Sequence, residues 1–146
     1  MSNEASRGAL LLGIDPGRTK CGYAAVYDDG TRVSLEVVPA QSLTQRIQRD
    51  VSTGTVAVIC VGNATTSEAV LSLCRRMWPA TEVALVDERN TTFEARKLYY
   101  EDHPPKGLLR LLPRGLLVPS EPLDGYAALL IVNRWRSLQA GGGGKP

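Results

Sequence analysis

Three acidic residues stand where an expected element of the chain begins or ends. Asp15 and Glu88 each follow a strand-sized apolar run, and Asp124 opens a helical stripe near the C-terminus. An isolated carboxylate is costly to bury unless it is paired with a positive charge or bound to a cation. Functional groups in an open α/β sheet gather at the carboxyl ends of its strands. The three acids therefore predict a site for a hard cation such as Mg²⁺ or Mn²⁺.

Each acid also has a purely structural interpretation. Asp15 fits a turn in which its side chain accepts hydrogen bonds from backbone amides. Glu88 can pair with the neighbouring Arg89. Asp124 suits the first turn of a helix, where an acid interacts favourably with the helix dipole. Taken together, the three acids favour a metal site more than any one of them does alone.

The composition excludes several other kinds of site. The chain has 146 residues, a net charge of +2, a single histidine (His103) and 3 cysteines without a CxxC spacing. A zinc site is therefore not expected. Cys21, Cys60 and Cys74 are expected to be reduced and buried. No apolar run approaches the ~18 residues of a membrane span and no signal peptide is evident, so we expect a cytoplasmic protein without a membrane partner.

The elements that must position the acids follow from apolar periodicity. Strands are expected over residues 9–14, 21–27, 31–38, 55–61 and 82–86. Capping-box signatures at Ser42, Thr65 and Thr91 each predict a helix, and a last helix is expected over residues 123–138. The order β-β-β-α-β-α-β-α predicts an α/β fold with a mixed five-stranded sheet flanked by helices. The apolar stripes expected to face the sheet are Leu43, Ile47 and Val51; then Ala69, Val70, Leu73, Cys74 and Met77; and finally Ala128, Ile131, Trp135 and Leu138 in line with Asp124.

One domain accounts for most of the chain. We expect it over residues 9–138, after a flexible N-terminus (1–8) and before a disordered Gly-rich tail (139–146). Within it, residues 103–122 carry five prolines and several basic side chains, which predicts a mobile basic loop. The alternative for this segment is a partly helical connection that packs its leucines.

Three segments resemble a known family. Residues 13–22 (GIDPGRTKCG) resemble the opening of RuvC-like proteins of the RNase H-like superfamily. Residues 86–92 (VDERNTT) resemble the DERxTT motif of the YqgF (RuvX) family, and residues 123–131 (LDGYAALLI) resemble its C-terminal Asp-x-x-Ala-Ala helix. The resemblance extends over about residues 9–138, nearly the whole chain.

The resemblance implies an RNase H-like fold and a metal-dependent nuclease. Asp15, Glu88 and Asp124 would be the catalytic acids that hold two Mn²⁺ or Mg²⁺ ions. Glu121, three residues before Asp124, is a fourth candidate ligand by analogy with RuvC-type resolvases, and its alternative role is that of a solvated acid ahead of the helix. The family is associated with 5′-end maturation of 16S ribosomal RNA and with Holliday-junction resolution.

We therefore expect hydrolysis of phosphodiester bonds in RNA or single-stranded nucleic acid, in 5′-end processing of pre-16S rRNA. The alternatives are a Holliday-junction resolvase and a non-catalytic module that binds nucleic acid. Nucleic acid is the expected partner, and a homodimer is the form that symmetric junction cleavage would need. Candidate substrate contacts are the basic and polar residues near the acids: Arg18, Thr19, Lys20, Asn63, Thr65, Arg89, Lys106, Arg110 and Arg114. Because these cations are local, a net charge of +2 is compatible with a basic groove.

Overall fold

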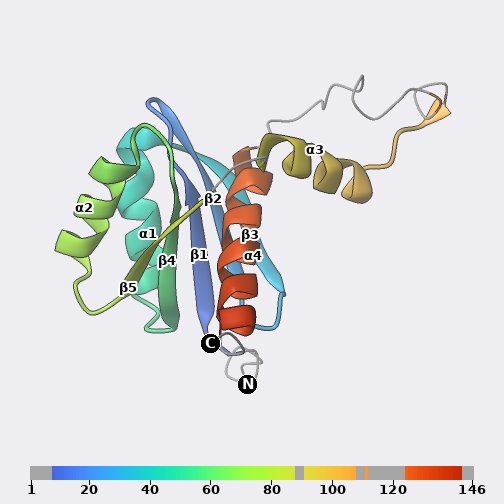
Figure 1. Cartoon of the computed structure of the whole chain (residues 1–146). Coiled ribbons are helices and arrows are strands. Elements are labelled where there is room, and N and C mark those ends of the chain that lie inside the picture. Colours follow the sequence, from blue (N-terminus) through green and yellow to red (C-terminus); the bar gives the residue numbers. More distant parts are fainter. Residues whose placement is uncertain (1–7, 88–90, 108–110, 112–123, 143–146) are drawn as a thin grey trace.

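A computed structural model describes residues 8–87, 91–107, 111 and 124–142 (Figure 1). The strands are β1 (Leu10–Asp15), β2 (Lys20–Tyr27), β3 (Arg32–Pro39), β4 (Val56–Gly62) and β5 (Glu82–Val86). The helices are the 3₁₀ turn η2 (Ala40–Ser42), α1 (Leu43–Val51), α2 (Ser67–Met77), α3 (Thr91–Asp102) and α4 (Asp124–Gly142). Each of the five predicted strands is present within one residue of its expected bounds.

The strands form one mixed sheet in the order β3-β2-β1-β4-β5. The β1–β2 and β2–β3 pairs are antiparallel, whereas the β1–β4 and β4–β5 pairs are parallel. The predicted mixed five-stranded sheet is therefore confirmed. Because β1, β4 and β5 run in the same direction, the residues that follow them emerge at one edge of the sheet.

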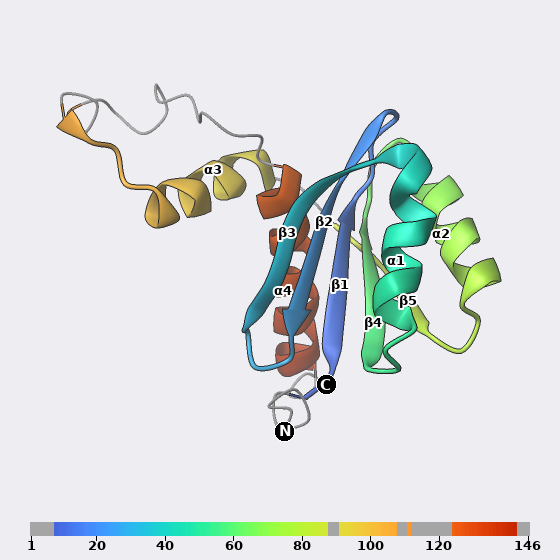
Figure 2. The same cartoon turned by 180° about the vertical axis from the view of Figure 1, so that it is seen from behind.

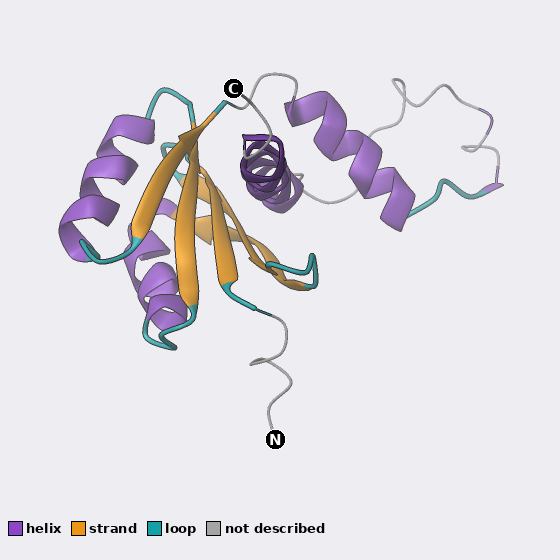
Figure 3. Ribbon diagram, turned by 60° about the horizontal axis from the view of Figure 1, so that its bottom comes forward, coloured by secondary structure: helices purple, strands orange, loops and turns teal. Residues whose placement is uncertain are grey.

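Helices cover both faces of the sheet. Helices α1 and α2 lie on one face and α4 lies on the other, as Figures 1 and 2 show from opposite sides. The core under α1 and α2 is built around Ile14, Tyr23 and Ile59, and the core under α4 includes Leu11 and Ile131. Figure 3 shows α4 nearly end-on beside the sheet, with α3 beyond it. Because successive side chains of a strand point to opposite faces of the sheet, every second residue of β1 faces α4.

Two predicted helix starts differ in detail from the structure. Ser42 precedes α1 but makes no side-chain capping bond, because it is the last residue of the turn η2. Helix α2 begins at Ser67, with Thr66 rather than Thr65 at the capping position. There the hydroxyl of Ser67 donates to the carbonyl of Ala64 at 2.7 Å instead. The capping-box patterns located these helices correctly, but their predicted side-chain bonds do not form.

The buried stripes also differ from two of the three predictions. On α2, Leu71 and Cys74 are buried, whereas Met77 is 43% exposed, because the helix turns a slightly different face to the sheet. On α4, Ile131 is buried as predicted but Leu138 is 59% exposed. The helix continues to Gly142, beyond the predicted end at residue 138, and its residues 137–140 are exposed.

Helix α3 is attached to the rest of the molecule by polar and aromatic contacts. A carboxylate oxygen of Asp102 accepts hydrogen bonds from Arg32 of β3 and from the hydroxyl of Tyr126 of α4, both at 2.8 Å. The rings of Tyr99 and Tyr126 meet edge to face, 5.9 Å apart. Asp102 thus links three elements next to the start of α4.

Predictions from the sequence also concern the cysteines, membrane-spanning segments and the histidine. The three cysteines are free and buried, as expected. No helix in the described part of the chain has the length and apolar character that crossing a membrane requires. His103, the only histidine of the chain, is exposed and stacks on the ring of Tyr99.

Candidate functional site

Asp15 is the last residue of β1 and lies opposite Gly22 of β2. Alternation along β1 places Asp15 on the same face as Gly13 and Leu11. Leu11 belongs to the core under α4, and Gly13 lies directly under that helix. The side chain of Asp15 therefore belongs to the α4 face, at the edge where β1 ends. It is half-buried there.

Asp124 reaches the same place because α4 lies directly on two glycines. A side chain at Gly22 would overlap the carbonyl oxygen of Asp124, and one at Gly13 would overlap that of Ala128. Asp124 and Ala128 are one helical turn apart, so the glycines of neighbouring strands accommodate one face of α4. Gly22 consequently has Asp15 as its strand partner and Asp124 packed on its surface. The fold thus brings two acids that are far apart in the sequence to one glycine.

The charges at this edge act on one another. The ammonium of Lys20 lies 3.3 Å from a carboxylate oxygen of Asp124. Burial raises the pKa of the neighbouring Cys21 thiol, and the negative charges of Asp15 and Asp124 raise it further. One thiol thus senses both carboxylates. The site is an acidic edge with a lysine on one of its acids.

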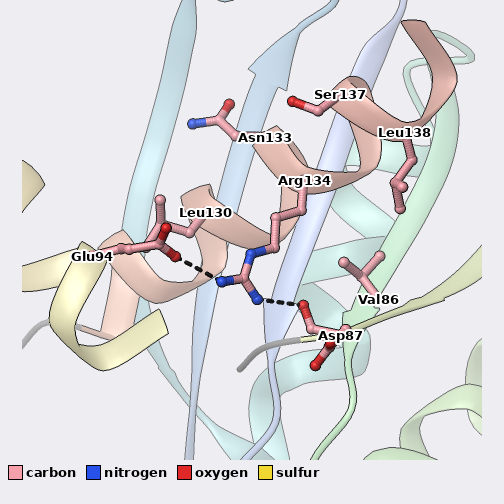
Figure 4. A pocket seen from close by; sticks show the side chains of 8 residues that line it. All are labelled: Val86, Asp87, Glu94, Leu130, Asn133, Arg134, Ser137 and Leu138. Carbon is pink, nitrogen blue, oxygen red and sulfur yellow. Dashed lines mark hydrogen bonds and ion pairs between the residues drawn. The ribbon is translucent and has the colours of Figure 1, made fainter. Parts of the chain in front are cut away.

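Glu88, the third predicted acid, lies outside the described residues, but both flanks of its segment are fixed. Arg134 of α4 donates to the backbone carbonyl of Asp87 and to the carboxylate of Glu94, each at 2.7 Å. Figure 4 shows this guanidinium between the end of β5 and α3. Arg134 therefore ties the residues before and after positions 88–90 to the helix that begins with Asp124.

A groove of about 590 Å³ surrounds this arginine. It is open to solvent and lies between the end of β5, α3 and the outer side of α4 (Figure 4). Its lining residues are Val86, Asp87, Glu94, Leu130, Asn133, Arg134, Ser137 and Leu138. The groove offers amide, hydroxyl and guanidinium donors beside the segment that contains Glu88.

Several predicted substrate contacts gather at the same edge. Arg18, Thr19 and Lys20 are exposed on the connection that follows Asp15. Asn63 and Thr65 are exposed where β4 ends. The backbone amide of Asn63 donates to the carbonyl of Val86 at 2.9 Å, which joins this loop to the end of β5. The structure therefore brings the first-turn cations and the polar loop to the carboxyl edge of the sheet.

The structure does not place the remaining predicted site residues at this edge of the sheet. Lys106 is exposed beyond the end of α3. Glu121, Arg89, Arg110 and Arg114 lie outside the described residues, as does most of the predicted basic loop. Their roles stay predictions.

Gly13, Gly22 and Arg134 were not predicted as functional residues. A glycine inside a strand often marks a close backbone approach, so both glycines carried a usable signal. Arg134 carried no signal, because nothing in its helical context shows that a surface arginine bonds to segments about 40 residues away.

The donors at this edge suit a hard cation. Asp15 and Asp124 supply carboxylate oxygens, and the ion pair with Lys20 shows that the Asp124 carboxylate can take a cation. Oxygen ligands of this kind are those that Mg²⁺ and Mn²⁺ prefer. Among the described residues no group of three acidic, histidine or cysteine side chains is close enough to form a metal site. A third protein ligand would therefore have to come from outside those residues, and Glu88 is the predicted one.

Comparison with curated proteins supports the resemblance carried by the sequence motifs. A protein of Coxiella burnetii named "putative pre-16S rRNA nuclease" is 28% identical over 144 residues, which cover 89% of this chain and 94% of that protein. The same values are found for its counterparts in other strains of that organism. No protein-family model matches the chain. The resemblance to the YqgF family is thus confirmed by a relative that aligns over nearly its full length.

Comparison with solved structures confirms the fold. The yeast mitochondrial Holliday junction resolvase Ydc2 superimposes with a TM-score of 0.50 and 12% identity, over 90% of this chain and 79% of the resolvase. The chain therefore has the RNase H-like α/β fold of a resolvase. A "putative sugar kinase" from Cytophaga hutchinsonii aligns over 63% of this chain and 39% of the kinase, with 11% identity and a TM-score of 0.40.

Proposed function

We propose that this chain is a metal-dependent nuclease that hydrolyses phosphodiester bonds in RNA or single-stranded nucleic acid, in 5′-end processing of pre-16S rRNA. The observation that carries the proposal is the meeting of Asp15 and Asp124 at Gly22. The name and full-length alignment of the Coxiella burnetii relative support the choice of RNA as substrate.

The proposed metal ligands are Asp15, Asp124 and Glu88. Two Mg²⁺ or Mn²⁺ ions, when bound, would supply a water nucleophile at neutral pH and stabilise the leaving oxygen. The chain's own part is to hold the acids in place, and α4 does this for Asp124 by resting on Gly22. No histidine takes part in this proposal, because the only one, His103, is exposed and stacked on Tyr99 at the far end of α3.

Exposed groups beside the acids would bind the substrate backbone. Arg18 and Thr19 follow Asp15 without being buried, and Asn63 and Thr65 lie across the same edge. Contacts of this kind are made to phosphate and sugar and carry little sequence information. They fit a nuclease that is directed to its substrate by strand form and not by a base sequence.

Carboxamide substitutions of the acids test the catalytic proposal. Asp15→Asn and Asp124→Asn keep the shape of each side chain but remove its charge. Each should therefore lower the rate of cleavage by about 10²-fold or more. Glu82→Gln is the matched control, because Glu82 is an exposed acid at the opposite end of β5. Wild-type cleavage by Asp15→Asn in Mn²⁺ would contradict the mechanism.

A substrate panel tests the choice of nucleic acid. Single-stranded RNA, single-stranded DNA, duplexes and a four-way junction are each incubated with Mg²⁺ or Mn²⁺. We expect cleavage of RNA or flexible single strands. Symmetric cutting of the junction alone would identify a resolvase instead, and binding without cleavage in either metal would identify a non-catalytic module.

A further inference from the structure

The ion pair between Lys20 and Asp124 joins a candidate substrate contact to a proposed metal ligand. Lys20 is the first residue of β2 and Asp124 the first residue of α4. Their charged atoms are 3.3 Å apart, and the two side chains are 56% and 31% exposed. The lysine therefore already pairs with a carboxylate oxygen that a divalent cation would use as a ligand.

Stability does not account for this contact. An ion pair with this much exposure contributes little to the stability of the fold. The start of α4 is already fixed by the close packing of Asp124 on Gly22 and by Tyr126, whose hydroxyl is bonded to Asp102. The pair is thus not needed to hold the helix, and its consequence is electrostatic.

We propose that Lys20 and the metal ion compete for Asp124, and that the displaced lysine then contacts the substrate phosphate. This inference rests on the proposed nuclease function and adds a role for one residue. With Lys20 in place, one ammonium offsets part of the charge of Asp15 and Asp124. A divalent cation at Asp124 repels the ammonium at this range, and a phosphate that enters the site attracts it.

The lysine side chain suits this exchange. Its charge is a compact ammonium at the end of a flexible four-carbon chain, so it can change partners without movement of the backbone. More than half of the side chain is exposed, so it is free to swing toward the solvent side where a substrate would arrive. Lys20 thus keeps the acidic edge partly neutral until metal and substrate take over its two roles.

Binding of Mn²⁺ without nucleic acid tests the competition. The free ion is measured by electron paramagnetic resonance for the wild type, Lys20→Met and Arg18→Met. Lys20→Met should bind Mn²⁺ about two- to fivefold more tightly, which corresponds to the strength of an exposed ion pair. Arg18→Met removes an equal charge two residues away, and it should change the affinity clearly less.

The outcomes of these measurements distinguish a failure of this inference from a failure of the proposed function. If the wild type binds Mn²⁺ and Lys20→Met binds it no more tightly, or if Arg18→Met has an equal effect, the competition is wrong while the nuclease proposal stands. If the wild type neither binds Mn²⁺ nor cleaves any substrate of the panel, both proposals are wrong.

Cleavage at saturating Mn²⁺ tests the second role of Lys20. Lys20→Met should cleave more slowly although it binds the metal more tightly, because the phosphate has lost its cation. These opposite shifts distinguish an exchanging lysine from one that only supports the fold, which would move neither. An unchanged or faster rate would overturn the phosphate contact.

Discussion

The carbonyl oxygen of Asp124 lies so close to Gly22 that the strand has no room for a side chain at this position. Gly22 is also the strand partner of Asp15. This packing fixes the height of α4 above the sheet, and with it the place of the Asp124 carboxylate. The site therefore depends on a residue without a side chain.

Substitution of Gly22 tests this dependence. Gly22→Ala should lower stability by about 3 kcal/mol, because backbone atoms of α4 must move away. Gly13→Ala is the matched comparison, since its methyl group would also overlap α4, there with Ala128 and Val132. Urea denaturation measures both losses, and cleavage is then assayed where both variants are folded. We expect Gly22→Ala to lose more activity than Gly13→Ala, and equal losses would contradict a local role for Gly22.

The sheet could be predicted from the sequence because its strands are continuous apolar runs that end in turn signals. The predicted bounds of β5, for example, are those of the structure. Helix stripes were harder to predict, since one-residue differences in helix phase decide whether Leu71 or Met77 faces the core. The candidate acids Asp15 and Asp124 could be named from their positions at element ends, but their meeting could not.

Long-range polar contacts could not be predicted at all. The bonds from Arg134 to Asp87 and Glu94 connect residues 47 and 40 positions apart. The bond from Arg32 to Asp102 joins residues 70 positions apart. Such contacts depend on where α3 and α4 pack, which no local pattern encodes.

Arg134 should control the third acid without contacting the substrate. Arg134→Met removes both bonds that flank residues 88–90, so Glu88 should be held less firmly. We expect a lower affinity for Mn²⁺ and slower cleavage, with little change in thermal stability, because Arg134 is a partly exposed residue. Glu94→Gln leaves the bond from Arg134 to Asp87 in place, so it should lower the Mn²⁺ affinity and the cleavage rate less. Unchanged metal affinity in Arg134→Met would show that the segment is positioned by other contacts.

The predicted basic loop should contribute to binding by charge alone. Replacing Lys106, Arg110 and Arg114 together with glutamine should weaken binding of nucleic acid and lower the slope of log K against log salt by up to ~2 for a single strand. Fluorescence anisotropy at several salt concentrations measures both. The substitution of Lys106 should not affect folding, because this residue is exposed. Binding with an unaltered salt slope would remove the loop from the substrate interface.

The buried arginine of α1 should set part of the acid sensitivity of the fold. Arg46 is 8% exposed, lies 4.4 Å above the ring of Tyr23, and pairs with Glu36 at 2.8 Å and Asp50 at 3.0 Å. Hydrogen bonds from Arg46 hold the pKa of Glu36 below its usual value. The stabilisation is therefore complete above the unfolded pKa of about 4.3 and is lost as the pH falls through the lower folded value.

Arg46→Met should remove both ion pairs and, with them, this part of the dependence of stability on pH. At pH 7 we expect a loss of about 3 kcal/mol, because two carboxylates lose the cation they face. Between pH 5 and about pH 3 the variant should lose less further stability than the wild type, since the pKa of Glu36 is no longer held down. Arg32→Met is the matched control: Arg32 lowers the pKa of Asp102 but has a side chain that is 40% exposed, so its removal should cost little at pH 7. Urea midpoints at each pH measure these changes, and an equally steep acid loss in Arg46→Met would assign the sensitivity to other carboxylates.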